Sequence, residues 1–333
     1  MARADLETIA GLLDGCVDVR RRPDSVQPLR YPLPEAGFYD PFTRWVATTP
    51  AGVRLRFRTP STSVRLHVNQ RLMVGEPGVE RRGAYDLFVD GRPAGRAWAE
   101  GGQALQSDMT GVGDERATVT FEGLPAGDKG VEVWLPQAAT VSIRGLETND
   151  GTEVRLWPDD RKSILFHGSS ISHCMEATGA AGTWGAVAAN LAGLRHVNLG
   201  WGGSCLLSGL VARIIRDQRA DAIVLKLGIN VWAEGMLKER TFLDSAHSML
   251  SIIREKHAAT PICVVSPIFS PGREDQGSGG GLPLARMREL LEAVVQALQS
   301  LAQALNAATP IRENGQVYHG HTKWWVNWHF RWF

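Results

Sequence analysis

Alternating strands and helices between residues 160 and 310 constrain the fold more than any other feature of this sequence. Four short apolar runs in this region predict strands, at residues 163–166, 196–199, 222–227 and 261–266. Four stretches of helical composition predict helices between and after them, at residues 183–192, 209–218, 241–256 and 284–305. Largely apolar strands that alternate with helices are typical of a parallel sheet with helices on both faces. We therefore expect an α/β domain at residues 160–333.

The first 150 residues show a different pattern, in which apolar and polar residues alternate. Six short runs alternate in this way, at residues 53–58, 63–68, 85–89, 117–121, 130–135 and 140–143. A period of two predicts strands with one face on a core and one in solvent, and Asp90-Gly91 is a hairpin turn signal. Such strands predict an antiparallel β-sandwich or jelly roll at residues 1–150. The arginines on these strands and at residues 20–22 are expected on solvated faces.

Charge and cysteine usage exclude several classes of protein. Lys and Arg number 36 against 35 Asp and Glu, so the net charge is +1 and no phosphate-tracking nucleic-acid surface is expected. No apolar run approaches the ~18 residues of a membrane span, and the N-terminus lacks the apolar core of a secretory signal. The four cysteines are widely spaced, which favours reduced thiols over disulfides or a zinc site. These features predict a cytoplasmic protein with no nucleic-acid or membrane partner.

Polar and glycine-rich clusters follow three of the four predicted parallel strands, at the edge where such sheets bind ligands. Ser170 follows the first strand, Gly203 the second and Asn230 the third. A serine on a tight strand-to-helix turn exposes its hydroxyl, and its backbone N–H can face a developing oxyanion. A glycine allows close backbone approach, and an asparagine amide supplies a third donor. Three converging donors suit the tetrahedral intermediate of acyl transfer.

These clusters resemble the conserved blocks of the SGNH (GDSL-type) hydrolases. The run Gly-Ser-Ser-Ile at residues 168–171 resembles the first block, with Ser169 where the eponymous Asp usually stands. Residues 198–203 and 228–230 resemble the second and third blocks. The resemblance implies a flavodoxin-like parallel sheet and no metal or organic cofactor. It also implies the roles of three residues: nucleophile for Ser170, and oxyanion hole for Ser170, Gly203 and Asn230.

The N-terminal half fits the same resemblance. Residues 83–88 approximate, with one extra residue, the G-x-D-L-Y signature of a β-sandwich that precedes some SGNH domains. Two-domain relatives of this kind include carbohydrate deacetylases and actinobacterial acyltransferases that decorate polyketides. The resemblance therefore implies hydrolysis of a carbohydrate or other small ester through an acyl-enzyme on Ser170. Acyl transfer onto a natural-product hydroxyl is the alternative, and either substrate is a small-molecule ester or acyl donor.

The resemblance fails near the C-terminus, where the family has a D-x-x-H-P block that supplies the base and its orienting acid. No Asp follows Asp275, and four of the last ten residues are Trp. Three histidines remain as candidate bases, of which His329 lies nearest to an echo of the block: His319, His321 and His329. We hypothesise that the native reading frame is lost near residue 316, which leaves the α/β domain C-terminally incomplete. On that hypothesis the chain is a damaged acyl-transfer enzyme, with a nucleophile and an oxyanion hole but no base. The missing block also favours a further alternative, a catalytically impaired ligand-binding module.

Each candidate also has a structural interpretation. Ser170 in isolation is a typical helix N-cap, Gly203 a typical turn glycine, and Asn230 a residue that tolerates the left-handed conformation. His167 and His173 flank the nucleophile and are expected to make structural hydrogen bonds.

Two further features lie near the candidate site in the sequence. Cys174 and Cys205 are expected to be small buried apolar residues rather than nucleophiles. The Gly/Ser-rich residues 277–281 predict a mobile loop on the active-site side, and residues 272–282 are expected to influence substrate choice.

Overall fold

The computed structural model of the 333-residue chain describes residues 2–73, 83–106, 110–149, 152–308, 311–313, 316–318 and 324–326. The chain divides into two compact units. The first contains Met1–Arg161 and Ser172–Leu199, and the second Lys162–Ile171 and Gly200–Phe333. The first unit thus contains the predicted sandwich domain together with one segment of the predicted α/β domain. The predicted domain limits, 1–150 and 160–333, stay a prediction.

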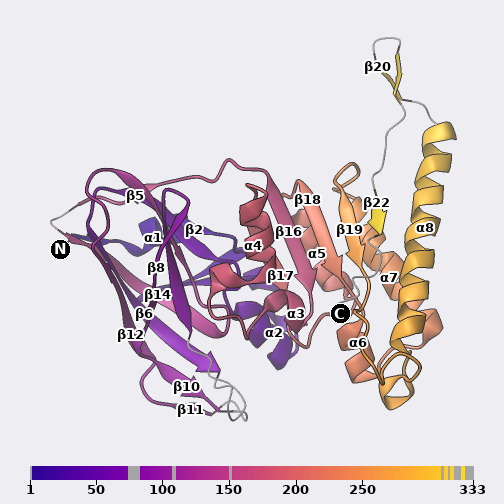
Figure 1. The fold of residues 1–333 in the computed structure, drawn as a ribbon, viewed down its shortest axis with the longest axis horizontal. Coiled ribbons are helices and arrows are strands. Elements are labelled where there is room, and N and C mark those ends of the chain that lie inside the picture. Colours follow the sequence, from indigo (N-terminus) through magenta and orange to yellow (C-terminus); the bar gives the residue numbers. More distant parts are fainter. Residues whose placement is uncertain are drawn as a thin grey trace. The chain divides into compact units, whose positions relative to one another are not determined.

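Two sheets with mostly antiparallel pairing dominate the first unit (Figure 1). One sheet contains β1 (Ala2–Ala4), β3 (Asp18–Arg22), β4 (Ser25–Leu29), β6 (Ser63–Met73), β9 (Glu100–Gly101), β10 (Gln103–Leu105), β11 (Gly111–Val112), β12 (Arg116–Glu122) and β14 (Ala139–Thr148). The other contains β2 (Leu13–Asp14), β5 (Arg54–Thr59), β7 (Ala84–Val89), β8 (Arg92–Trp98), β13 (Lys129–Trp134) and β15 (Arg155–Leu156). Helical segments complete this unit: α1 (Leu6–Leu12), η1 (Leu33–Phe38), α2 (Pro41–Thr48), η3 (Ala180–Gly182) and α4 (Trp184–Leu191).

The core of the first unit follows from the period-two pattern of its strands. Along β6, buried residues alternate with half-buried ones over most of the strand. The inward side chains Val64, Leu66 and Val68 are fully buried, and they belong to one cluster with Leu55 and Phe57 of β5. Burial of such side chains provides the main stabilising free energy of a sandwich, about 1.5–3 kcal/mol for each. The six alternating runs predicted from the sequence all lie within or overlap strands.

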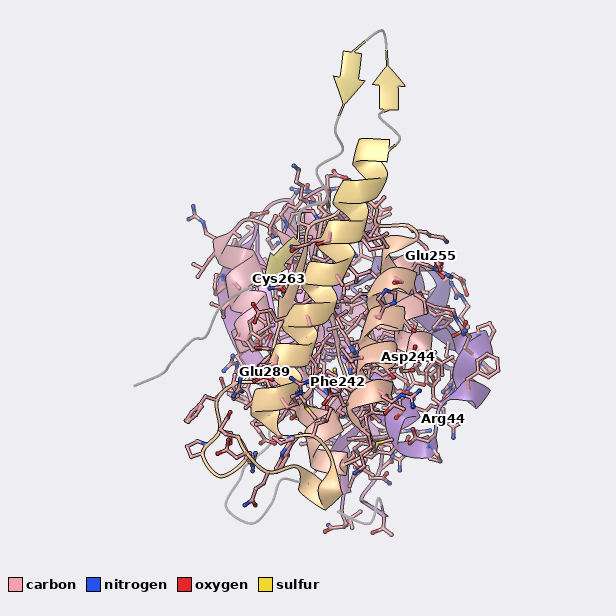
Figure 2. All side chains as sticks on the ribbon, turned by 90° about the vertical axis from the view of Figure 1, so that its right-hand side faces the viewer. Arg44, Phe242, Asp244, Glu255, Cys263 and Glu289 are labelled. Carbon is pink, nitrogen blue, oxygen red and sulfur yellow. The ribbon has the colours of Figure 1, made fainter. Side chains whose placement is uncertain are left out.

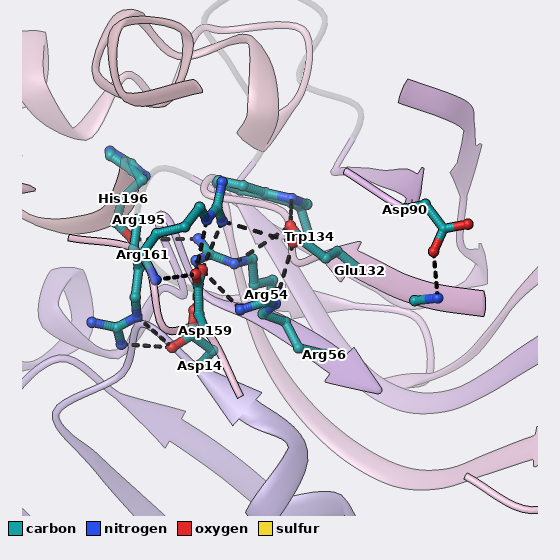
Figure 3. Close-up of polar contacts among 11 residues, drawn as sticks. Asp14, Arg54, Arg56, Asp90, Glu132, Trp134, Asp159, Arg161, Arg195 and His196 are labelled. Carbon is teal, nitrogen blue, oxygen red and sulfur yellow. Dashed lines mark hydrogen bonds and ion pairs between the residues drawn. The ribbon is translucent and has the colours of Figure 1, made fainter. Parts of the chain in front are cut away.

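Buried and half-buried charges form a network beside β5 in the first unit, which Figure 3 shows in close-up. Its charged members are Asp14, Arg54, Arg56, Glu132, Asp159, Arg161 and Arg195. The Arg54 guanidinium is fully buried, lies 4.6 Å from the centre of the Trp134 ring and pairs with Asp14 at 2.6 Å. Asp159 lies 2.8 Å from the Arg56 guanidinium and 2.6 Å from that of Arg161.

The expectation of solvated arginines on the strand faces is wrong for Arg54 and Arg56. Both are buried, because Asp159 and neighbouring residues that follow the sandwich in the chain cover this face of β5. Burial alone would raise the pKa of Asp159, but the hydrogen bond from Arg161 and the charge of Arg56 hold it well below its usual range. The carboxylate therefore stays ionised between its cationic partners.

Parallel strands form the sheet of the second unit. β16 (Ser163–Gly168), β18 (Ala222–Lys226), β19 (Ile262–Val265) and β22 (Trp324–Val326) pair in this order, each parallel to the next. The chain passes from the first unit into the second within β17 (Arg195–Gly200). The remaining elements are α5 (Gly209–Asp217), α6 (Ile229–Glu234), α7 (Glu239–Arg254), η4 (Ser278–Gly280), α8 (Leu284–Ala308), β20 (Ile311–Glu313) and β21 (Gln316–Tyr318). The fold class is α/β, as the strand and helix pattern predicts.

Helices α7 and α8 lie side by side against this sheet (Figure 2). In that view α8 crosses in front of Cys263 on β19, and Phe242 of α7 is fully buried. The buried residues of α8 recur at helical spacing: Leu284, Met287, Leu290, Leu291, Val294, Val295 and Leu298. An apolar stripe of this period is what fixes a helix on a sheet. Within the described part of the chain, no helix is long and apolar enough to cross a membrane.

Candidate active site

The turn between β16 and α3 (Ser170–His173) places two serines in opposite environments. Ser169 is fully buried, and its Oγ accepts a hydrogen bond of 3.3 Å from the Ile171 N–H. Ser170, one residue later, is exposed at the first position of the helix. The structure thus presents the hydroxyl of Ser170 to solvent at the carboxyl end of the parallel strand, where ligands of such sheets bind.

The glycine-rich segment after β17 forms a tight turn fastened to β16. The Trp201 N–H donates to the carbonyl of Gly168 over 2.7 Å, and the Ser204 N–H donates to the Trp201 carbonyl over 3.0 Å. Within this turn Gly203 has a φ of 73°, in the left-handed region that glycine adopts without a steric penalty. Gly203 is therefore a turn glycine, and the turn holds it beside the strand that carries Ser170.

Asn230 lies at the start of α6, directly after β18. Its side-chain Oδ1 accepts a hydrogen bond of 3.1 Å from the Cys205 N–H. Because the oxygen accepts from the backbone, the amide nitrogen Nδ2 faces the other way and is the donor end. Asn230 lies in the helix and not in the left-handed region, which removes the interpretation as a left-handed turn residue. Its side chain is 91% buried, at 9% relative exposure.

Residues 201–205 thus connect the three predicted positions. Their first residue bonds to the end of β16, two residues before Ser170, and their last residue bonds to Asn230. Gly203 is in the middle of this bridge. The arrangement provides an exposed hydroxyl together with backbone and side-chain N–H donors on neighbouring segments of one unit, which are the parts that acyl transfer needs.

A buried cluster of three polar side chains lies behind the bridge. The Cys205 Sγ lies 3.5 Å from the Nε2 of His167 and 3.7 Å from the carbonyl of Lys226. Burial raises the pKa of the Cys205 thiol to about 12, although the Lys226 charge acts in the opposite direction. Cys205 is therefore a protonated thiol and not a nucleophile, and His167 is a buried structural residue, as both were predicted to be.

The far end of α3, which belongs to the first unit, is held by several hydrogen bonds. The Nε2–H of His173 donates to the Gln137 carbonyl over 2.9 Å and lies 2.9 Å from the Thr49 hydroxyl. The Asn198 side chain donates to the Ser172 carbonyl over 2.9 Å. His173 is thus structural, as predicted. The role of Asn198 was missed, because nothing in a linear pattern indicates which distant carbonyl an amide reaches.

The candidate bases His319, His321 and His329 lie outside the described residues. The reading-frame hypothesis for the tail stays a hypothesis. The structure does describe Trp324–Val326, which pairs with β19 as the parallel strand β22. Among the described residues, no group of three or more His, Cys, Asp and Glu side chains is arranged to hold a metal ion.

Comparisons with known proteins add independent findings. Residues 161–276 match the model of the GDSL-like lipase/acylhydrolase family. A comparison with curated proteins gave no significant match. Among solved structures, the chain is similar to a salicylyl-acyltransferase, SsfX3, from a tetracycline biosynthetic pathway, with 27% identity, coverage of 87% of this chain and 80% of that chain, and a TM-score of 0.76.

Two further structures share the fold at lower identity. A GDSL-like lipase of Bacteroides ovatus, described as putative in its own structure report, is 19% identical over 90% of this chain and 84% of its own, with a TM-score of 0.67. A family two carbohydrate esterase of Clostridium thermocellum, in complex with cellohexaose, is 14% identical over 87% of this chain and 85% of its own, with a TM-score of 0.58.

The family match and the structural site coincide in sequence. The matched segment includes Ser170, Gly203 and Asn230, together with all the hydrogen bonds that connect them. The parallel sheet and the sheet-rich N-terminal region agree with the architecture of the similar structures. Residues 161–276 therefore carry the match to the GDSL-like lipase/acylhydrolase family, and this match and the similar structures support a serine esterase or acyltransferase.

Proposed function

We propose that this protein hydrolyses the acyl ester of a carbohydrate or of another small molecule, through an acyl-enzyme on Ser170. The observation that carries this proposal is the bridge of residues 201–205, which is bonded both to the strand before Ser170 and to Asn230. The family match supports the reaction class. The carbohydrate esterase among the similar structures supports the fold in which the reaction takes place.

The proposed reaction has two halves. A base takes the proton of Ser170 Oγ as the oxygen attacks the ester carbonyl carbon, and the carbonyl oxygen gains the negative charge. The Ser170 N–H, the Gly203 N–H and the Asn230 Nδ2 donate to this oxyanion. Collapse of the intermediate breaks the bond to the alcohol oxygen, which leaves with the proton from the base. Water then attacks the acyl-enzyme in the same way and releases the acid.

We assign the base to His329. The support is the position of β22, which runs parallel to β19 and ends at Val326, three residues before His329. Parallel strands end at the same edge of a sheet, so the chain leaves β22 at the edge where Ser170 and Asn230 follow β16 and β18. No Asp follows Asp275, so the histidine has no aspartate of the usual block to orient it. Loss of that acid alone costs about 10⁴ in kcat in serine proteases.

The test follows release of p-nitrophenol from p-nitrophenyl esters, combined with intact-mass measurement of the acyl-enzyme. We expect slow turnover by the wild-type protein, an acyl adduct of one equivalent, and neither from Ser170→Ala. His329→Gln should abolish acylation, whereas His247→Gln, at an exposed position on α7, should not. A folded protein that forms no adduct but binds the ester would instead support the impaired binding module.

Acyl transfer to a hydroxyl acceptor is the second candidate. It is favoured by the similarity to the salicylyl-acyltransferase, which is 27% identical to this chain over the aligned residues. An acceptor alcohol would take the place of water in the second half-reaction, with the same oxyanion donors. Addition of polyhydroxylated acceptors should then increase p-nitrophenol release and yield an acylated acceptor by mass spectrometry. A rate of p-nitrophenol release that no acceptor changes would contradict acyl transfer and favour hydrolysis.

A further inference from the structure

The segment after β19 leaves the sheet beside the oxyanion residue. Lys226 at the end of β18 pairs in register with Val265 at the end of β19. Asn230 follows Lys226 by four residues, and Ile268 follows Val265 by three. The two exits are in contact, because a Cβ added to Gly228 would lie 2.6 Å from the Cγ of Pro267. The residues that follow Pro267 therefore start next to residues 228–230, which include Asn230.

This segment, residues 266–283, is called the strap here, and it is fastened to α6. The Trp232 indole N–H donates to the Gln276 carbonyl over 2.9 Å, and the Ser278 hydroxyl donates to the Ala233 carbonyl over 3.2 Å. The Arg273 guanidinium lies 5.0 Å from the centre of the Trp232 ring, within cation–π distance. The middle of the strap is thus held against the helix that begins beside Asn230.

The strap is also fastened to α8. Arg288 donates to the Pro267 carbonyl over 3.1 Å and pairs with Glu274. Glu274 in turn accepts from the Ser270 N–H over 2.7 Å. The predicted loop at residues 277–281 lies within this strap, which is bonded to two helices. A segment fixed in this way can act as a preformed wall of a binding site.

Large apolar side chains are exposed at the start of the strap and just beyond the end of α6. Phe269 is 64% exposed, Ile268 46% and Met236, just beyond α6, 57%. Residues 266–269 include no charged side chain. Single exposed apolar residues are ordinary, but Ile268 and Phe269 are consecutive and directly follow Pro267, which contacts the segment that leads to Asn230. Two such side chains beside a proposed oxyanion donor mark a surface for a ligand.

We propose that Ile268 and Phe269 form the binding surface for a large apolar acyl group, aromatic or medium-chain, on the ester that Ser170 attacks. The inference rests on the proposed function and adds the class of acyl group. An acetyl group is too small to cover this surface. A phenyl ring or a chain of several methylenes would bury it and gain the corresponding transfer free energy.

The experiment compares p-nitrophenyl benzoate with p-nitrophenyl acetate. The ratio of their kcat/KM values, divided by the ratio of their rates with hydroxide, measures the preference of the protein for the larger acyl group. We expect a preference of at least tenfold for benzoate. Phe269→Ser and Ile268→Ser should each lower this preference about tenfold, because each removes one apolar side chain from the surface. The control is Leu301→Ser, which likewise removes an exposed apolar side chain, but on α8. It should leave the preference for benzoate unchanged.

The outcomes separate this inference from the proposal on which it rests. A protein that turns over acetate through Ser170 but shows no preference for benzoate overturns the inference and leaves the proposed function standing. A preference that persists in both strap variants also overturns it, because the acyl group would then bind elsewhere. Failure of both esters to acylate Ser170 overturns the proposed function and the inference together.

Discussion

At the scale of single residues, the proposed role of Asn230 as an oxyanion donor rests on one direct contact. The Cys205 N–H holds its Oδ1, so its Nδ2 is directed as a donor before any substrate arrives. Asn230→Ala should therefore lower kcat on a p-nitrophenyl ester by about 10²–10³, with little change in KM, because one oxyanion donor is lost. Steady-state kinetics check this, with Asn190→Ala on the exposed face of α4 as the control. An unchanged kcat would mean that Asn230 does not face the oxyanion.

Lys226 permits a second prediction at this scale. Its side chain is 7% exposed, and its Nζ has no hydrogen-bond partner among the described residues. Burial lowers the pKa of this amine, so the unfolded chain holds the proton more tightly and protonation at neutral pH favours unfolding. Lys226→Met should raise the free energy of unfolding at pH 7 by about 1–3 kcal/mol. Urea denaturation, with the exposed Lys162→Met as control, measures it. A less stable Lys226→Met variant would contradict this account of the amine.

The site residues differ in how far the sequence could identify them. Ser170, Gly203 and Asn230 stand at strand ends within recognisable motifs, and local chain geometry determines their positions. The contacts that hold them are not local. The Cys205 N–H to Asn230 and the Asn198 amide to Ser172 each join residues more than twenty positions apart. Such partners depend on how the strands pack, which no residue pattern along the chain expresses.

At the scale of elements, α3 depends on bonds at both of its ends. Ser170 and Ile171 begin it beside β16. At its other end the Ser172 carbonyl accepts from Asn198, and the His173 ring donates to the Gln137 carbonyl. Asn198→Ala removes the bond to the Ser172 carbonyl and frees the end of the helix. We expect kcat to fall about 10²-fold, as small displacements of a nucleophile cause, with KM nearly unchanged. A rise in KM with constant kcat would show that α3 is placed without this bond.

The strands show where period-two patterns succeed and where they fail. The pattern placed β5, β6 and β7 correctly as strands, although only β6 shows the alternating burial that the pattern predicts. It assigned Arg54 and Arg56 to solvent, whereas the structure buries both. The covering residues, Asp159 above all, come from outside the strand pattern. The alternation of apolar and polar residues indicates which residues share a face of the strand. Which segments cover that face depends on the rest of the fold.

At the scale of the whole molecule, the sequence does not predict that segments of the two units alternate along the chain. Residues 172–199 have the composition of the α/β domain, yet they cluster with the sandwich. The charges on Arg195 and Asp14, which lie 2.5 Å apart, contribute to this attachment. Sequence patterns separate segments by secondary structure, and they carry no information on which core a segment joins.

His196, in the same segment, makes the stability of the protein depend on pH. Burial, together with the charge of Arg54, lowers the pKa of His196 from 6.5 to about 3. Between those pH values the His196 ring is protonated in the unfolded chain and neutral in the folded protein. The free energy of unfolding therefore falls as the pH falls, by up to about 1.4 kcal/mol per pH unit. His196→Phe keeps an aromatic ring against Trp134 and should flatten the decline between pH 6.5 and 4.5. Urea denaturation across this pH range measures the free energy of unfolding of both proteins. An equally steep decline of this free energy in the variant would contradict the assignment to His196.

The central claim is that Ser170 is an activated nucleophile, and one measurement tests it most directly. The protein is treated with a fluorophosphonate probe, and the modified peptide is identified by mass spectrometry. Wild type and Ser300→Ala, at an exposed serine of α8, are predicted to carry one adduct on the peptide that contains Ser170. Ser170→Ala should carry none. An unmodified wild-type protein with an intact folded spectrum, or an adduct on any other residue, would contradict the claim.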